Sequence, residues 1–196
     1  MEESPGQHLR RDVYLAALRD SLQLLPLAEE VAGQGGLHLR VLFQPTFHDT
    51  AALTLHLWEA VGRVEMVVPS AALEQWAGQQ SLRPDTATPP PPGGLTSAEA
   101  PVLAPAGQAF RAAVADLPLT ALQARRWTDA RDGMEADGEV VEDGYRGSFA
   151  AWSPTPARNP EAYRLCRALL DLGLACLPDA RSQTVLTALH SYLHED

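Results

Sequence analysis

Apolar residues occupy every second position in three short segments of the first half of the chain, residues 37–43, 53–58 and 64–68. Alternation with a period of two is typical of β-strands, because successive side chains point to opposite sides of a sheet. The apolar positions are Leu37, Leu39, Val41, Phe43, Leu53, Leu55, Leu57, Val64, Met66 and Val68. The pattern predicts a three-stranded antiparallel meander with one buried face, and its long connection at residues 44–52 is a candidate functional loop.

Three later segments, residues 119–129, 134–142 and 145–152, are also strand-like. The dipeptides Asp132–Gly133 and Asp143–Gly144 separate them, and Asp-Gly is a strong signal for a hairpin turn. We therefore expect a second three-stranded meander. Two meanders provide about six strands, which predict an α+β fold with one antiparallel sheet packed against helices. Two separate small domains are the alternative, although each would have a thin core.

Helical spacing of apolar residues predicts helices before, between and after these strands. The segments are residues 10–25, 71–77, 110–117, 160–177 and 180–193. Ser70, Asn159 and Asp179 each precede a predicted helix, and their side chains are of the types that cap helix N-termini. The segment after Asn159 is apolar on nearly all sides, so we expect it to be the most buried helix.

Prolines and glycines concentrate in residues 84–105, which contain the run Pro89–Pro92 followed by Gly93 and Gly94. Proline lacks a backbone N–H and fixes φ, so this composition disfavours a helix interior or an inner strand. The segment is predicted to be an extended linker or exposed loop between the two halves of a single domain that spans residues 1–196.

The chain contains no lysine, and all 15 of its basic residues are arginine. This absence excludes Schiff-base chemistry, a phosphate-loop lysine and a Ser–Lys catalytic couple. Isoleucine is also missing and Asn159 is the only asparagine, a bias that indicates a bacterium with a G/C-rich genome.

Acidic residues outnumber basic ones, 25 against 15, and the formal net charge is −10. The chain lacks the basic cluster that neutralises phosphates, so nucleic acid and membrane surfaces are disfavoured partners. No segment has the roughly 18 consecutive apolar residues of a membrane span, and residues 1–11 lack a signal-peptide core, so a cytoplasmic location is expected. Cys166 and Cys176 fall in one predicted helix, about 15 Å apart along its axis, which predicts reduced thiols.

Residues 132–177 resemble a pattern of uncharacterised bacterial proteins. The pattern has an Asp-Gly turn, a strand, a second glycine turn, an aromatic strand that ends in Trp-Ser-Pro, and an apolar helix. The matching residues are Asp132, Gly133, Gly144, Tyr145, Trp152, Ser153, Pro154 and the helix over residues 163–174. The resemblance implies the order of strands and helix in this region and carries no activity or cofactor.

A polar and aromatic patch is the first candidate site, and its members are His38, Arg40, His56 and Trp58. They lie on the face of the meander opposite the leucines, on strands expected to be neighbours. Arginine and histidine suit a carboxylate or phosphate ligand, and the histidines suit a metal if His48 or Asp49 folds over them. An ordinary solvated sheet face is the alternative interpretation.

An acidic hairpin is the second candidate site, with Asp132, Glu135, Asp137, Glu139 and Glu142 as its contact residues. The spacing does not match a calcium-binding loop, because Met134 and Ala136 occupy ligand positions. Alternating carboxylates on one strand face are typical of a solvated sheet edge. The same charge is also suited to docking a basic protein.

No catalytic motif is assembled in the sequence. His190 and His194 have a zinc-chelating spacing, but no third ligand lies nearby and Ser191 replaces the glutamate of a metalloprotease helix. No Gly-x-Ser-x-Gly serine elbow is present, and no cofactor is predicted. We therefore expect a non-catalytic bacterial protein that acts through protein–protein contact. The alternatives are an enzyme or a ligand-binding or metal-binding protein that uses the His38, Arg40 and His56 face, and a structural subunit of a larger assembly.

Overall fold

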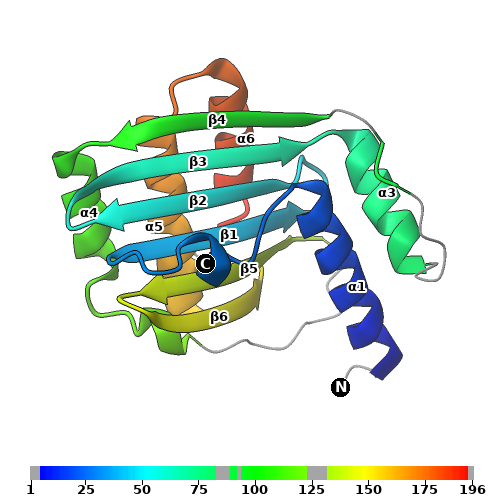
Figure 1. The fold of residues 1–196 in the computed structure, drawn as a ribbon, viewed down its shortest axis with the longest axis horizontal. Helices are drawn as coiled ribbons and strands as arrows, with labels where there is room; N and C mark the ends of the chain where they lie inside the picture. The colour runs from blue at the N-terminus through cyan, green and yellow to red at the C-terminus, as the bar shows by residue number, and fades with distance from the viewer. Residues whose placement is uncertain (1–4, 83–88, 92–93, 123–131, 194–196) are drawn as a thin grey trace.

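Six antiparallel strands form one sheet in the order β4–β3–β2–β1–β5–β6, with helices on both of its faces (Figure 1). The strands are β1 Leu37–Pro45, β2 Ala51–Trp58, β3 Val61–Pro69, β4 Leu95–Val102, β5 Met134–Glu142 and β6 Tyr145–Trp152. The structure, a computed structural model, describes residues 5–82, 89–91, 94–122 and 132–193, with the backbone alone for residues 5–12 and 81. The predicted α+β fold with a six-stranded antiparallel sheet is confirmed.

Helices precede, interrupt and follow the strands. They are α1 Pro5–Ser21, α2 Leu27–Glu30, α3 Ala71–Leu82, α4 Ala104–Val114, the short 3-10 helix η1 Leu119–Ala121, α5 Pro160–Cys176 and α6 Ala180–His190. The predicted cap of α6 is confirmed, because the Asp179 side chain accepts a 2.9 Å hydrogen bond from the Ser182 N–H. The predicted cap of α5 is wrong, because Asn159 makes no side-chain capping bond.

The first predicted meander is confirmed as β1, β2 and β3. In its register, Leu37 lies opposite Leu57, and Leu57 lies opposite Gly62. β1 also pairs with β5, so this strand lies inside the sheet. Strict alternation located these strands correctly because each one sets a full row of apolar side chains against the same core.

The second predicted meander is wrong in its first strand. After Pro118, residues Leu119–Ala121 form η1 through a bond from the Ala121 N–H to the Pro118 carbonyl, which curls the chain. Residues 123–129 of that predicted strand lie outside the described part of the chain. The rest is a two-stranded hairpin of β5 and β6, with Asp143 and Gly144 both at positive φ in its turn.

The sixth strand comes from the proline-rich segment, where a linker or loop was predicted. Residues Leu95–Val102 form β4, which pairs with β3 along one edge of the sheet. An edge strand tolerates Pro101, because a missing N–H on the open side breaks no ladder bond. The prediction is therefore wrong for residues 95–102, while residues 84–88 and 92–93 of this segment lie outside the described residues.

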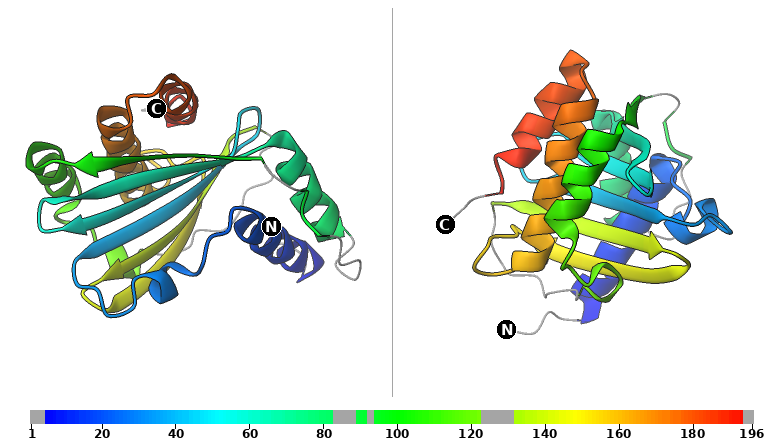
Figure 2. Two further views of the ribbon diagram at one scale, coloured as in Figure 1. Left: turned by 45° about the horizontal axis from the view of Figure 1, so that its top comes forward. Right: turned by 90° about the vertical axis from the view of Figure 1, so that its left-hand side faces the viewer.

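The main hydrophobic core lies between the sheet and the layer formed by α4, α5 and α6 (Figure 2). Among the described helices, α5 supplies the largest set of buried residues, as predicted. Leu165 and Leu169 of α5 are fully buried there. Gly173 lets α6 approach, because an added Cβ would lie 3.2 Å from the Leu186 side chain.

The opposite face of the sheet is also covered, although the alternation predicted one buried face only. α1 and α3 pack over one part of it, where Leu18 meets Leu42 and Ala77 in a second hydrophobic cluster. The short helix α2 covers another part with Leu27 and Val31. The expectation of a single buried face is therefore wrong for β1 and β2, because elements on both sides of the meander in the sequence fold back over it.

Candidate functional site

The predicted patch of His38, Arg40, His56 and Trp58 lies on this second face. Pairing of β1 with β2 sets His38 directly opposite His56. His38, Arg40 and His56 are 0%, 5% and 1% exposed, whereas Trp58 is 40% exposed. The predicted grouping is therefore confirmed, and the alternative of a solvated sheet face is wrong for the three buried members. Residues 25–36, which join α1 to β1 and include α2, provide the cover (Figure 1).

The two histidines contact each other directly. Their Nδ1 atoms are 3.0 Å apart, and the Nε2 of His38 lies 3.2 Å from the Gly35 carbonyl oxygen. A carbonyl oxygen only accepts, so this contact assigns the proton of His38 to Nε2. His38 Nδ1 then accepts from the Nδ1–H of His56, and the Nε2 of His56 is left as a buried lone pair without a hydrogen-bond partner among the described residues.

Glu30 faces both His56 and Arg40. Its Oε2 accepts a 2.5 Å hydrogen bond from Arg40, and its Oε1 lies 3.4 Å from the Nε2 of His56. Arg40 also donates to the Thr54 hydroxyl at 3.0 Å and to the Leu25 carbonyl at 2.6 Å. The guanidinium is thus a buried cation with three separate acceptors, which ties β1 to β2 and to the covering segment.

Both histidines are held in the neutral form near pH 7. Burial, together with the positive charge of Arg63 on β3, lowers the pKa of His56 from 6.5 to about 4 against the opposing effect of Glu30. The pKa of His38 is also lowered, mainly by burial. A neutral pair has the single shared proton that the Nδ1–Nδ1 contact requires.

Trp58 connects this buried network to solvent. Its ring stacks on His56 with a centroid separation of 6.2 Å and an interplanar angle of 17°, and it meets the edge of His38 at 5.8 Å. Gly36 passes close beside the ring, because a Cβ there would lie 2.6 Å from the Leu57 carbonyl oxygen and 3.3 Å from the Trp58 side chain. Its φ of 103° also requires glycine.

The geometry of the patch is that of a closed hydrogen-bonded network. The Arg40 donors already have protein acceptors, and the ring nitrogens of His38 face Gly35 and His56. No group of three or more His, Cys, Asp or Glu residues able to hold a metal occurs in the part of the chain that the structure describes. The predicted metal role therefore has no ligand set among the described residues to support it, and the predicted carboxylate or phosphate ligand stays a prediction.

The predicted acidic contact residues do not form one exposed surface. Glu135 and Asp137 are 6% and 8% exposed, and Gln44 donates a 3.1 Å hydrogen bond to Asp137. Glu139 is partly buried and accepts a 2.8 Å bond from the Leu27 N–H. Alternation did place these three carboxylates on one strand face, but that face is covered rather than solvated.

The outer members of the acidic set lie at opposite ends of β5. Asp132 is exposed just before the strand, whereas Glu142 ends it and pairs with Arg111 of α4 at 3.3 Å. Only Glu142 therefore remains beside the Asp143–Gly144 turn as part of a possible contact surface.

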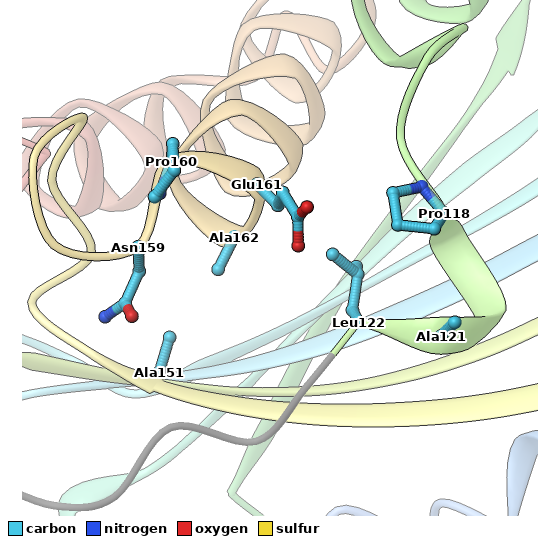
Figure 3. Close-up of a pocket in the computed structure, with 8 residues that line it drawn as sticks. All are labelled: Pro118, Ala121, Leu122, Ala151, Asn159, Pro160, Glu161 and Ala162. Carbon is cyan, nitrogen blue, oxygen red and sulfur yellow. The ribbon is translucent and has the colours of Figure 1, made fainter.

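A pocket that the sequence did not indicate lies at the N-terminus of α5 (Figure 3). Its volume is about 360 Å³, and its lining residues are Pro118, Ala121, Leu122, Ala151, Asn159, Pro160, Glu161 and Ala162. The Oδ1 atom of Asn159 is buried and has no hydrogen-bond partner among the described residues. The Asn159–Pro160 helix start marks this place in the sequence, but the facing wall comes from η1, which was predicted as a strand.

Exposed large apolar side chains gather at one end of the sheet. Strand pairing places the β2–β3 turn, the end of β4 and the β5–β6 turn along this end. We call their exposed apolar residues the turn-end patch: Trp58 at 40%, Val61 at 52%, Leu103 at 66% and Tyr145 at 74% exposure. Trp58 was expected on the polar face of the meander, whereas no pattern in the sequence indicated the exposure of Val61, Leu103 and Tyr145.

Two acidic residues occupy the turns of this same end. Glu59 and Asp143 are exposed and adopt φ angles of 58° and 47°. Trp58 and Tyr145 are three strands apart, a span of roughly 14 Å at the usual strand spacing. Trp58 and Val61 share the sheet face of His56, whereas Tyr145 pairs with Glu142 on the face of Leu37, so the turn-end patch wraps around the end of the sheet.

Other predicted features lie elsewhere. His190 pairs with Asp171 at 3.0 Å, and residue 194 lies outside the described residues. The connection between β1 and β2 is tied to α6 by the 2.5 Å bond from Arg181 to Asp49, and to the residues after α6 by the 2.9 Å contact of His48 with the Tyr192 hydroxyl. Both cysteines are free thiols.

Comparison with protein families, curated proteins and solved structures gave no match for this chain. The resemblance of residues 132–177 to uncharacterised bacterial proteins therefore stays a prediction. None of the helices described is long and apolar enough to cross a membrane.

Proposed function

We propose that the protein acts without catalysis by binding a basic protein partner through the turn-end patch. The observation that carries the proposal is that the four patch residues are among only seven exposed large apolar residues in the described part of the chain. Exposed apolar patches mark interaction surfaces, and tryptophan and tyrosine are frequent anchors of binding energy.

Charge defines the chemistry of the partner. Glu59 and Asp143 lie at the turns of the patch, where Arg111 is already paired with Glu142, and the whole chain carries a formal net charge of −10. A partner with arginine or lysine around an apolar anchor complements this surface and is steered toward it. A second copy of the same chain would bring its own −10 to the interface, so self-association there is disfavoured.

Photo-cross-linking in cells of the source organism tests the proposal. A photoreactive phenylalanine analogue replaces Val61 in the patch, and in a matched control it replaces Phe47, which is 71% exposed at the opposite end of the sheet. We expect one discrete cross-linked basic protein from position 61 and none from position 47. The charge reversal Glu59→Arg should strongly reduce the yield of this product.

The same experiment contains the results that contradict docking. Identical products from both positions, or no product from position 61, would show that the patch is ordinary surface. A product at twice the 21.1 kDa chain mass would identify self-association and reject a basic partner. An acidic partner whose yield survives the charge reversal would reject the charge argument.

Binding of a small molecule in the α5 pocket is a second candidate function. Its volume of about 360 Å³ fits a small ligand, and the buried Asn159 Oδ1 offers an acceptor to a ligand N–H or O–H. The exposed rim residue Ala121 allows the pocket to be filled by Ala121→Trp. A small apolar amine or amide that raises the Tm of the wild type but not of this variant would support the site, and the absence of such a compound from a screen would reject it.

A further inference from the structure

Two of the three polar contacts of the His38–His56 pair are hydrogen bonds while both rings are neutral. The contacts run in series: from the Gly35 carbonyl to His38, from His38 to His56, and from His56 to Glu30. Two neutral imidazoles bring two protons, which the first two contacts use, so His56 and Glu30 meet without a proton and the Nε2 of His56 is a buried lone pair. The contact without a proton is also the longest, at 3.4 Å for His56 and Glu30 against 3.2 and 3.0 Å for the others.

Both outer contacts end on residues 25–36, the segment that covers the pair. α2, the only helix in this segment, has four residues and little stability of its own. The segment depends on contacts with the sheet, such as the bond from the Leu27 N–H to Glu139 at 2.8 Å and the bond from Arg40 to the Leu25 carbonyl at 2.6 Å. Such a segment can open locally while the main core stays folded.

We propose that the His38–His56 pair is a proton-operated latch, which holds residues 25–36 on the sheet while both rings are neutral and releases them when the pair takes up a proton. This goes beyond the docking function and does not depend on it.

The charges around the pair set the direction of the latch. Arg40 of β1 and Arg63 of β3 oppose a positive charge on the rings, and Glu30 of α2 favours it. On the β5 side, the residue opposite His38 is Val141, which carries no charge, and the carboxylate on the same strand face, Glu139 opposite Arg40, is paired with Arg19 at 3.0 Å. Glu30 already accepts a 2.5 Å hydrogen bond from Arg40. Its negative charge therefore compensates only part of the positive charge that a proton would add to the closed His38–His56 pair.

Opening removes this penalty, because both rings then reach water and ionise at their ordinary pKa. Protons therefore bind the open form more tightly and shift the equilibrium toward it. With the pKa of His56 lowered from 6.5 to about 4, the equilibrium constant for opening rises roughly twentyfold between pH 7 and pH 5. His38 acts in the same direction.

Hydrogen exchange of the full chain at pH 7 and pH 5, corrected for the intrinsic exchange rate, tests the latch. We expect the protection of residues 25–36 to fall roughly twentyfold, and that of α5 to change much less. His56→Gln should reduce the response of the segment to the part that His38 alone supplies. His190→Gln is the matched control, since it removes a histidine that pairs with a carboxylate at 3.0 Å on the surface, and it should leave the response intact.

Equal responses of the segment and α5, or an undiminished response in His56→Gln, would overturn the latch. The wild type provides a second measurement that no folding defect of a variant affects. Its ring proton signals should show His56 titrating below about pH 5, and a midpoint near its ordinary pKa of 6.5 with the segment still protected would reject the proposal.

Discussion

The carboxylate of Glu30 accepts a 2.5 Å hydrogen bond from the guanidinium of Arg40. This contact joins a four-residue helix to a central strand of the sheet. Arg40 is 5% exposed, whereas the Glu30 side chain is 28% exposed. The buried Arg40 cation therefore depends on the carboxylate of a partly exposed residue. Loss of this contact between α2 and β1 would leave the cation buried without its compensating charge.

Glu30→Gln should lower the free energy of unfolding by about 2 kcal/mol, because a buried guanidinium loses its only charged partner in the network. Urea denaturation at pH 7 measures the change. Glu29→Gln is the matched control, since Glu29 is an exposed neighbour on the same helix, and it should alter the free energy by less than about 0.5 kcal/mol. Equal effects of the two substitutions would contradict the role of the Glu30–Arg40 bond.

The free energy of unfolding should fall as the pH drops from about 6.5 toward 4. The folded pKa of His56 is lowered to about 4, so the unfolded chain binds a proton that the folded chain rejects. The stabilisation is fully present above pH 6.5 and is lost as the pH falls through the folded pKa. The loss from His56 amounts to about 2 kcal/mol by pH 5. Urea denaturation across this range should show a much smaller slope in His56→Gln, and an unchanged slope would contradict a buried neutral pair.

The sequence predicted those parts of the fold in which a periodic pattern faces a single core. β1, β2 and β3 followed from alternation, and α6 followed from Asp179 as its cap. β4 was missed because Pro101 and the preceding proline run outweighed a weak apolar pattern of mainly small residues on an edge strand. η1 was missed because the sequence after Pro118 is compatible with either a strand or a tight turn.

The candidate site was predicted only as far as local register allows. His38 and His56 were expected to be neighbours, and they lie directly opposite each other. Their burial depends on residues 25–36, and nothing in a sequence pattern shows which face of a sheet such a short segment will cover. Glu30 could not be identified for the same reason, since its partners Arg40 and His56 belong to other elements.

Alanine substitution at two glycines should change stability in opposite directions. A Cβ at Gly138 would lie 1.9 Å from the ring of Phe149, its cross-strand partner, which is 3% exposed and has little room to move. Gly138→Ala should therefore destabilise the fold by about 1–3 kcal/mol. Gly78 lies inside α3 with no atom within 4 Å of an added Cβ, so Gly78→Ala should stabilise it by about 0.5–1 kcal/mol. Urea denaturation decides, and a loss of stability at Gly78 or none at Gly138 would contradict this packing.

The two thiols should differ strongly in reactivity. Cys166 is fully buried, and burial raises its pKa to about 12, so roughly one molecule in ten thousand carries the thiolate at pH 8. Cys176 lies half-buried at the end of α5, and burial raises its pKa as well. Iodoacetamide at pH 8 should therefore label Cys176 slowly and leave Cys166 unmodified in the folded protein, while both react in urea. Peptide mass spectrometry resolves the two sites because Arg167 and Arg181 provide tryptic cleavage between and beyond them. Labelling of Cys166 at the rate of Cys176 in the folded protein would contradict the burial of α5 on which the core depends.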